Sequence, residues 1–546
     1  MARRHLDKTV KDSTERSFSV WMRFAFYGVA LSAMAVMLLY SGVHQNIWGD
    51  GHLYFELSQH IFQNDFYSTN LWRQYEFTQS YGVTNPPLWP IVIAIFNKMF
   101  HVGLWGGFVV NCLLSIATLY ILLRFGQVYF QLPLIGFVLY CVMTGNLAYW
   151  SEVACAGSTQ LQLFMLSCML FVYFRYKTFG LKQVIIFGLF AGLMMLNRSD
   201  FTLPAILLGL AIIKYSRLRK WQAGLVYYLS FGLLILPWCL HNIKIFGRPL
   251  VSDISRVALS AIPVTNLGFY IEKPPTLWER PVDWLYKLID QAGEELLFAG
   301  KVFVSDPIFM GVLLIALILQ WINVRSVSTT ALPMTNSTSA TISFNTKKTL
   351  WLTPVFLGLL FGIFLVSFHS ERYYIPIKIY LILFLAGICR ESFEKYNCKL
   401  SYITIGVAIL AIIGSFYTII HDSGGIKATW WALHEDRMLW QKIRFAEIEQ
   451  CLGKDKSFAK VLVLDRQIAD PIEFAALTGI RTIQDPDNLT VDTLLPLIKR
   501  FSATHVIVSA GQYKKELDNH FYVQKMCNLR VYKLLLPRAS KAKPIL

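Results

Sequence analysis

The sequence predicts an α-helical polytopic membrane protein, with about 11–13 transmembrane helices and a small C-terminal α/β extracytoplasmic domain. Hydrophobic residues make up 55% of the 546 residues and charged residues only 16%, and the mean hydropathy is +0.46. Soluble globular chains carry about 25% charged residues. Apolar runs recur along the chain at lengths near the roughly 20 residues that cross a bilayer. These observations favour many membrane spans over one large soluble core.

Apolar runs and charges together place the expected spans. They are 22–42, 87–100, 103–124, 132–149, 157–174, 183–197, 201–213, 222–241, 303–323, 350–368, 374–389 and 402–420. Basic residues at 214–220 and 390–399 indicate the cytoplasmic side. Counting back from these loops leaves one crossing in 87–150 hidden, or one run re-entrant. An odd total of 11 or 13 is therefore expected, with the N-terminus inside and the C-terminus outside.

The same charge pattern divides the chain into two parts. Residues 1–421 form the expected membrane module, with outer loops at 44–86 and 242–302, and residues 422–546 form the soluble domain. The formal net charge of +17 suggests a nucleic-acid partner, but Lys and Arg gather at span ends, as membrane topology requires. We therefore expect no nucleic acid, and the lipid bilayer is the expected surrounding of residues 1–421.

The residue pattern of the terminal domain predicts alternating strands and helices. Residues 460–465 predict a buried strand, 492–501 an amphipathic helix and 504–509 a second strand. Cys451 and Cys527 are its two cysteines, and a disulfide between them is a hypothesis that holds if the domain lies outside the cytoplasm.

Charged residues beside apolar runs are costly, so they are candidates for function. Asp50 follows the first span between two glycines, where its carboxylate could act as a general base or cap a helix. Arg198 and Asp200 stand between two runs, and could orient a substrate or pair with each other. Arg372 offers a planar guanidinium that suits phosphate oxygens or anchors to lipid headgroups, and Tyr373 follows it at interfacial depth.

A further group lies at the outer end of the span 222–241. His241 could be a metal ligand, a hydrogen-bond donor or a structural residue, and Asn242 follows it. Arg248 could meet a phosphate. With the residues above, this group places a carboxylate, a histidine, aromatic rings and arginines on one side of the membrane.

An ordered series of motifs resembles the GT-C superfamily of membrane glycosyltransferases, and most closely the branch of the lipid A aminoarabinose transferase and the protein O-mannosyltransferases. The series covers roughly 22–420. Its landmarks are Asp50, Pro86-Pro87-Leu88, the Gly-Leu-x-x-Leu-Asn-Arg stretch ending at Arg198, the Pro-Trp to Pro-Leu stretch 237–250, and Arg372 to Pro376.

The resemblance implies a sugar donor carried on polyprenyl phosphate, an active site on the outer face and inversion at the sugar carbon. It implies that Asp50 is the catalytic carboxylate and that Arg372 contacts the lipid phosphate. Relatives often carry a charged residue before Pro-Pro, where this chain has Thr84 and Asn85. Glu76 is the acidic residue that could substitute, so a divalent metal ion remains a candidate cofactor.

The sequence thus predicts an inverting glycosyltransferase of a bacterial inner membrane, with its active site on the periplasmic face. The acceptor is left open among lipopolysaccharide, another cell-envelope glycan and protein. Two alternatives remain. One is a glycan ligase or polymerase that uses polyprenyl diphosphate donors, and the other is a transporter of lipid or sugar. Transporters often show internal repeats, and no clear repeat is present.

Overall fold

The structure is a computed structural model. It describes residues 50–62, 71–72, 85–130, 136, 139–140, 143, 149, 152–153, 155–247, 249, 259–261, 275–304, 306, 309–311, 313–314, 346–366, 371–388, 437–464, 471–484, 491–508, 512–526 and 531–537. The expected spans 22–42 and 402–420 lie outside the described residues, as do Glu76, Arg248 and Cys527.

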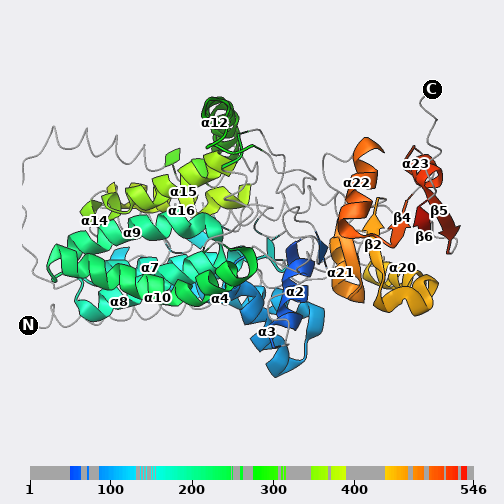
Figure 1. Cartoon of the computed structure of the whole chain (residues 1–546). Helices are drawn as coiled ribbons and strands as arrows, with labels where there is room; N and C mark the ends of the chain where they lie inside the picture. Colours follow the sequence, from blue (N-terminus) through cyan, green and yellow to red (C-terminus); the bar gives the residue numbers. More distant parts are fainter. Residues whose placement is uncertain are drawn as a thin grey trace, which may run out of the picture.

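A helical bundle occupies one end of the molecule, and a mixed α/β domain occupies the other (Figure 1). The described helices of the bundle are α3 (Leu88–Phe100), α4 (Gly106–Phe130), α7 (Thr159–Arg175), α8 (Leu181–Asn197), α9 (Thr202–Tyr215), α10 (Lys220–Phe246), α14 (Thr346–Leu350), α15 (Thr353–Val366) and α16 (Ile375–Ile388). Apart from the short α14, each of these helices falls on a run that the sequence predicts to be a span. Short 3-10 turns η1 (Gly103–Trp105), η2 (Ser199–Phe201) and η3 (Glu371–Tyr374) precede α4, α9 and α16.

Two described helices are long and apolar enough to cross a membrane by length and composition. They are Gly103–Tyr129 and Lys220–Ile245, and three shorter apolar helices accompany them at Leu88–Phe100, Leu181–Asn197 and Lys348–Phe364.

The long helix α10 has one packed face and one exposed apolar face. Gly188 of α8 lies so close to α10 that a Cβ there would come within 2.5 Å of the Tyr227 carbonyl oxygen, so only glycine permits this approach. The opposite face of α10 exposes leucines at spacings of three and four residues. They are Leu225, Leu229, Leu233, Leu236 and Leu240. An exposed apolar stripe on a helix of this length is typical of contact with lipid.

The C-terminal sheet has the strand order β1-β3-β2-β4-β6-β5. Its strands are β1 (Leu71–Trp72), β2 (Lys460–Val463), β3 (Arg481–Gln484), β4 (His505–Ile507), β5 (Phe521–Lys525) and β6 (Val531–Pro537). The pairs among β1, β3, β2 and β4 are parallel, and β6 pairs antiparallel with β4 and β5. Helices α20 (Arg437–Leu452), α21 (Pro471–Thr478), α22 (Val491–Phe501) and α23 (Gln512–His520) accompany them. Strands β2 and β4 and helix α22 confirm the three elements expected from the sequence.

One strand of this sheet comes from the loop after Asp50, which the sequence predicts to be outside. Leu71 and Trp72 pair with Thr482 and Ile483 of β3, in parallel register. Helix α2 (Asp50–His60), at the start of the same loop, packs against α3 of the bundle and α21 of the terminal domain. Figure 1 shows α2 beside α3, at the end of the bundle that faces the sheet. The loop that begins at Asp50 therefore joins the two parts of the molecule.

Cys451 at the end of α20 is disulfide-bonded. Its expected partner, Cys527, lies outside the described residues.

The stability of the terminal domain is expected to fall as the pH falls below about 6.5. Burial in β4 lowers the pKa of His505, and this effect exceeds the opposing attraction of Asp455, whose Oδ2 lies 3.4 Å from Nε2. The unfolded chain therefore binds the proton more readily than the folded domain. The stabilisation is fully present above the unfolded pKa and is lost below it, by up to about 1.4 kcal/mol per pH unit.

Hydrogen exchange of the β4 amides in the full chain, measured from pH 7.5 to 5.5, tests this expectation after correction for the intrinsic pH dependence. His505→Asn is the control and should flatten the profile. A wild-type profile as flat as that of the variant contradicts the assignment.

Candidate functional site

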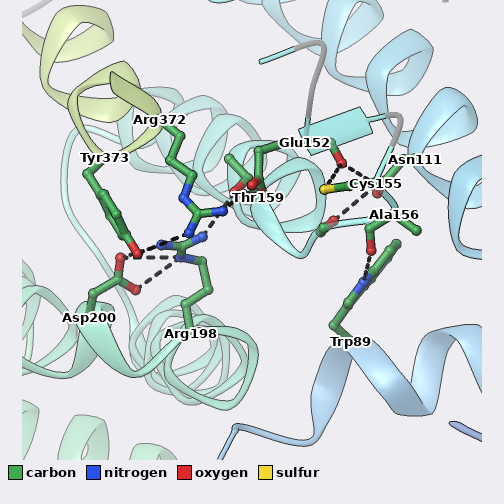
Figure 2. Close-up of polar contacts among 11 residues, drawn as sticks. Trp89, Asn111, Glu152, Cys155, Ala156, Thr159, Arg198, Asp200, Arg372 and Tyr373 are labelled. Atoms are coloured by element: carbon green, nitrogen blue, oxygen red, sulfur yellow. Dashed lines mark hydrogen bonds and ion pairs between the residues drawn. The ribbon is translucent and has the colours of Figure 1, made fainter. Parts of the chain in front are cut away.

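The site begins with a short non-helical turn directly before α7, at residues 155–158. Side chains from three helices bind its carbonyl oxygens. Trp89 Nε1 donates to the Ala156 oxygen at 2.7 Å, Asn111 Nδ2 donates to the Gly157 oxygen at 3.0 Å, and Asn197 Nδ2 donates to the Ser158 oxygen at 3.0 Å. Buried backbone carbonyls need such partners, so these bonds make an irregular turn stable inside a bundle (Figure 2).

The turn positions the carboxylate of Glu152, which is almost fully buried. Its Oε2 accepts a hydrogen bond from Thr159 Oγ1 at 2.7 Å, and its Oε1 accepts from Arg372 Nη1 in a short ion pair. A Cβ at Gly157 would lie 2.3 Å from Oε2, so the carboxylate occupies space that only glycine leaves free. Burial alone would raise the pKa of Glu152, but Arg372, Thr159 and Arg198 outweigh it and hold that pKa below its usual value.

A second ion pair lies beside the first, where α8 ends. Arg198 donates through Nε to Asp200 Oδ1 at 3.1 Å and through Nη2 to Asp200 Oδ2 at 2.9 Å, which is a bidentate contact. Its Nη1 donates to Thr159 Oγ1 at 3.0 Å. Thr159 thus accepts from Arg198 and donates to the Glu152 carboxylate.

Tyr373 joins the two pairs. The guanidinium carbon of Arg198 lies 4.9 Å from the centre of the Tyr373 ring, and that of Arg372 lies 5.2 Å from it. Both distances are within the range of cation–π attraction. We call these residues the arginine cluster: Glu152, Thr159, Arg198, Asp200, Arg372 and Tyr373 (Figure 2).

The arginine cluster contains two positive and two negative charges, so it is neutral as a whole. The side chains of Arg198, Asp200 and Glu152 are 12%, 8% and 6% exposed, whereas that of Arg372 is 26% exposed. Charges at this depth persist when they are paired and hydrogen-bonded. Arg372 is the member that an anion from outside reaches most easily, and its guanidinium can bind two phosphate oxygens.

Helix α12 (Pro281–Val304) holds the turn η3 that carries Arg372 and Tyr373. Tyr374 Oη donates to Glu295 Oε2 of α12 at 2.6 Å, in a buried contact. One helical turn further, Lys378 Nζ donates to Asp306 Oδ2 at 2.6 Å, and both side chains are buried. These bonds fix the first turn of α16 and the turn η3 before it, which carries Arg372.

The structure brings together four of the residues that the sequence predicts, Arg198, Asp200, Arg372 and Tyr373. The expected ion pair between Arg198 and Asp200 is present, and both residues also belong to the larger cluster.

The other predicted residues lie elsewhere or outside the description. Asp50 begins α2, and its side chain is not among the described ones. The ring of His241 stacks on Trp238 at 5.1 Å, and Asn242 donates to the Pro249 oxygen at 3.2 Å, so both have partners at the end of α10. Glu76 and Arg248 lie outside the described residues.

Glu152 and Thr159 are members of the cluster that the sequence reading missed. Glu152 stands between the runs 132–149 and 157–174, on the side predicted to be outside. An acidic residue between two apolar runs is the same signal that identified Asp200, so the sequence contained it. Thr159 carries no such signal, because a threonine within an apolar run is common.

Among the described residues, no group of three or more His, Cys, Asp or Glu could hold a metal ion. Glu76, the acidic residue weighed for a metal site, is not described. The divalent metal therefore stays a prediction from the resemblance.

The described fold is a bundle of apolar helices with a charged cluster at one end and an α/β domain beside it. No protein-family model matches the chain, and no curated protein sequence matches it. Two solved structures are similar over most of it. The structure of ArnT from Cupriavidus metallidurans bound to undecaprenyl phosphate has a TM-score of 0.46 and 12% identity, over 93% of this chain and 98% of that chain.

The second is the archaeal oligosaccharyltransferase AglB from Archaeoglobus fulgidus, in complex with an inhibitory peptide and a dolichol-phosphate. Its TM-score is 0.45 and its identity 10%, over 93% of this chain and 74% of that chain. Since both TM-scores lie below 0.5, the likeness carries no argument for activity, which must come from the residues of this chain.

The ion pair between Glu152 and Arg372 is expected to show energetic coupling. Glu152→Gln or Arg372→Gln alone leaves one charge without its partner, whereas the double variant removes both charges. We expect the double variant to be less destabilised than the sum of the single variants, with a coupling of about 1–3 kcal/mol. A double-mutant cycle of unfolding in detergent micelles measures it.

The exposed pair of Lys456 and Glu449 serves as the matched control, with Lys456→Gln and Glu449→Gln. Its coupling should stay below about 1 kcal/mol. Additive effects at Glu152 and Arg372 would contradict the pairing.

Proposed function

We propose that this chain is an inverting glycosyltransferase that moves a sugar from a polyprenyl phosphate to an acceptor outside the cytoplasm. The observation that carries the proposal is the arginine cluster. It gathers Arg198 and Arg372, which are 174 positions apart, around one tyrosine at the end of the bundle predicted to face outward. Both arginines belong to the motif series that resembles the GT-C superfamily.

The proposed reaction exchanges one bond for another at the sugar carbon. An acceptor hydroxyl or amine forms a bond to the anomeric carbon as the bond from that carbon to the phosphate oxygen breaks. The bonding electron pair leaves with the polyprenyl phosphate, and the acceptor proton passes to the carboxylate of Asp50 as general base. Attack from the side opposite the phosphate inverts the anomeric carbon.

The arginines are proposed to stabilise the leaving phosphate. The donor is a phosphodiester with one negative charge, and the released monoester carries up to two. Charge therefore grows on the phosphate during the reaction, and Arg372 offers it a charge-assisted, two-pronged contact. Arg198 lies within cation–π distance of the Tyr373 ring that Arg372 also contacts, so it helps to hold that ring in place.

Two observations support the proposed location in a membrane, with the site on its outer side. The bundle exposes apolar stripes such as that of α10. The disulfide of Cys451 is of a kind that persists in oxidising compartments outside the cytoplasm. We propose the periplasmic face of a bacterial inner membrane, with the glycan, lipid or protein acceptor still to be identified.

Asp50→Asn is expected to abolish transfer without changing the amount of protein in the membrane, because the amide cannot accept the acceptor proton. The measurement is release of polyprenyl phosphate from a panel of labelled polyprenyl-phosphate sugars in membranes that contain candidate acceptors. Asp518→Asn, in the terminal domain, is the control for loss of one carboxylate and should keep wild-type activity.

Turnover by Asp50→Asn at the wild-type rate would refute the role of Asp50. Consumption of a polyprenyl diphosphate donor alone would favour the ligase or polymerase. Movement of a sugar lipid across vesicles without covalent change would favour the transporter.

Arg372→Lys is expected to lower kcat/KM for the donor by roughly 10–100-fold, since lysine keeps the charge but loses the planar fork. A hydrogen bond to a charged group contributes about 1.5–3 kcal/mol, which gives this range. The paired variant Arg198→Lys should have a smaller effect on kcat/KM than Arg372→Lys, because Arg198 is the less exposed of the two and already binds both carboxylate oxygens of Asp200. A larger loss in Arg198→Lys than in Arg372→Lys would reverse the two roles.

A further inference from the structure

Helix α12 is amphipathic in the opposite sense to a helix of a soluble protein. Its buried residues include Lys287, Gln291 and Glu295, which are spaced by four positions and so lie on one face. Lys287 Nζ donates to the Ser260 oxygen at 3.0 Å, and Glu295 accepts from Tyr374 at 2.6 Å. The polar face of this helix is therefore turned into the protein and bonded there.

The opposite face of α12 is apolar and exposed. At about 100° per residue, Val282, Leu285, Ile289 and Leu296 fall within one quadrant of the helix. They are 62%, 51%, 62% and 58% exposed. Tyr286, Leu297 and Val304 widen this face and are exposed to 71%, 79% and 69%. An exposed apolar surface of this extent on one helix indicates contact with something other than water.

Charged residues form a third face, beside the apolar one. Asp283, Asp290, Glu294 and Lys301 are all exposed and fall within about 40° of one another around the helix. A helix at a membrane surface needs such a face for the water and headgroup side, while its apolar face enters the acyl chains.

The direction of α12 agrees with a position at a membrane surface. Figure 1 shows α12 nearly along its axis, whereas α9 and α10 run across the picture. The helix thus lies across the direction of α10, which is long and apolar enough to cross a membrane. Almost all of α12 also falls in the loop 242–302, which the sequence predicts to be outside. A helix transverse to the spans lies parallel to the bilayer plane.

We propose that α12 is an interfacial helix whose apolar face lies among the acyl chains of the outer leaflet. The occupant of this face is lipid and not a second copy of the chain, because the exposed leucines of α10 present the same kind of surface along the predicted depth of the bilayer. Its charged face meets water and headgroups. The buried bond from Glu295 to Tyr374 then ties the turn of Arg372 to a helix that the bilayer itself holds. This proposal is independent of glycosyl transfer.

The test compares single-cysteine variants of the full chain in matched pairs, in vesicles of phosphatidylethanolamine and phosphatidylglycerol. The two positions of each pair are close in sequence but lie on different faces of α12. Ile289→Cys and Leu296→Cys probe the apolar face, and Asp290→Cys and Glu294→Cys are their matched controls on the charged face. A membrane-impermeant maleimide is added, and its adduct on each α12 peptide is quantified by mass spectrometry. We expect reaction at the apolar positions to be at least roughly tenfold slower, because hydrocarbon suppresses the reactive thiolate.

A second measurement identifies what covers the face. Wild-type protein is placed in the same vesicles with a trace of phosphatidylcholine that carries a photoreactive diazirine in its acyl chain. Adducts on Ile289 or Leu296 after illumination, together with slow maleimide reaction there, establish the proposal. Fast reaction at both faces would show that the helix lies in water and overturn it. Slow reaction without lipid adducts would show that protein covers the face, and would equally overturn it.

Discussion

The pairing of partly buried charges is the constraint on which the end of the bundle that carries the arginine cluster depends. An isolated charge at the depth of Glu152 or Arg198 would cost several kcal/mol, so each needs a partner of opposite charge. Arg372 supplies one and Asp200 the other, and Thr159 bonds both pairs at once. The segments that carry Glu152 and Thr159, the end of α8 and the turn before α16 are therefore fixed by one set of contacts. Elements that are remote in sequence acquire their relative positions from this electrostatic requirement.

The segment that contains α2 and β1 imposes a second constraint, on the terminal domain. Because β1 pairs with β3 and α2 packs between α3 and α21, the sheet is joined to the bundle by more than the chain connection at 389–436. Asp50 begins the helix at this junction. A displacement of the terminal domain would therefore shift the backbone that carries Asp50. The domain is thus in a position to influence any reaction that uses this carboxylate, although it contributes no member of the arginine cluster.

The sequence predicted the helices and strands that depend on consecutive residues, but not the contacts between residues far apart in the chain. Apolar runs gave helices α7 to α10, and alternating segments gave β2, α22 and β4, since both signals are properties of consecutive residues. The pair of Arg198 and Asp200 was accessible for the same reason. The bonds of Glu295 to Tyr374 and of Asp306 to Lys378 join residues 79 and 72 positions apart, which no local reading detects. Strand β1 has two residues in a polar loop, and only the edge of β3 makes it a strand.

The neutrality of the arginine cluster bears directly on the proposed reaction. A phosphate that approaches Arg372 must compete with Glu152, which already accepts from it. A phosphodiester donor with one negative charge competes weakly, whereas a leaving monoester with up to two competes more strongly. The exchange of Glu152 for phosphate is therefore favoured as the bond to the sugar breaks. Interactions that strengthen only then raise the rate without tightening the ground state. In the proposed reaction, the carboxylate that shields Arg372 at rest would raise the rate by keeping the guanidinium from binding the donor too firmly.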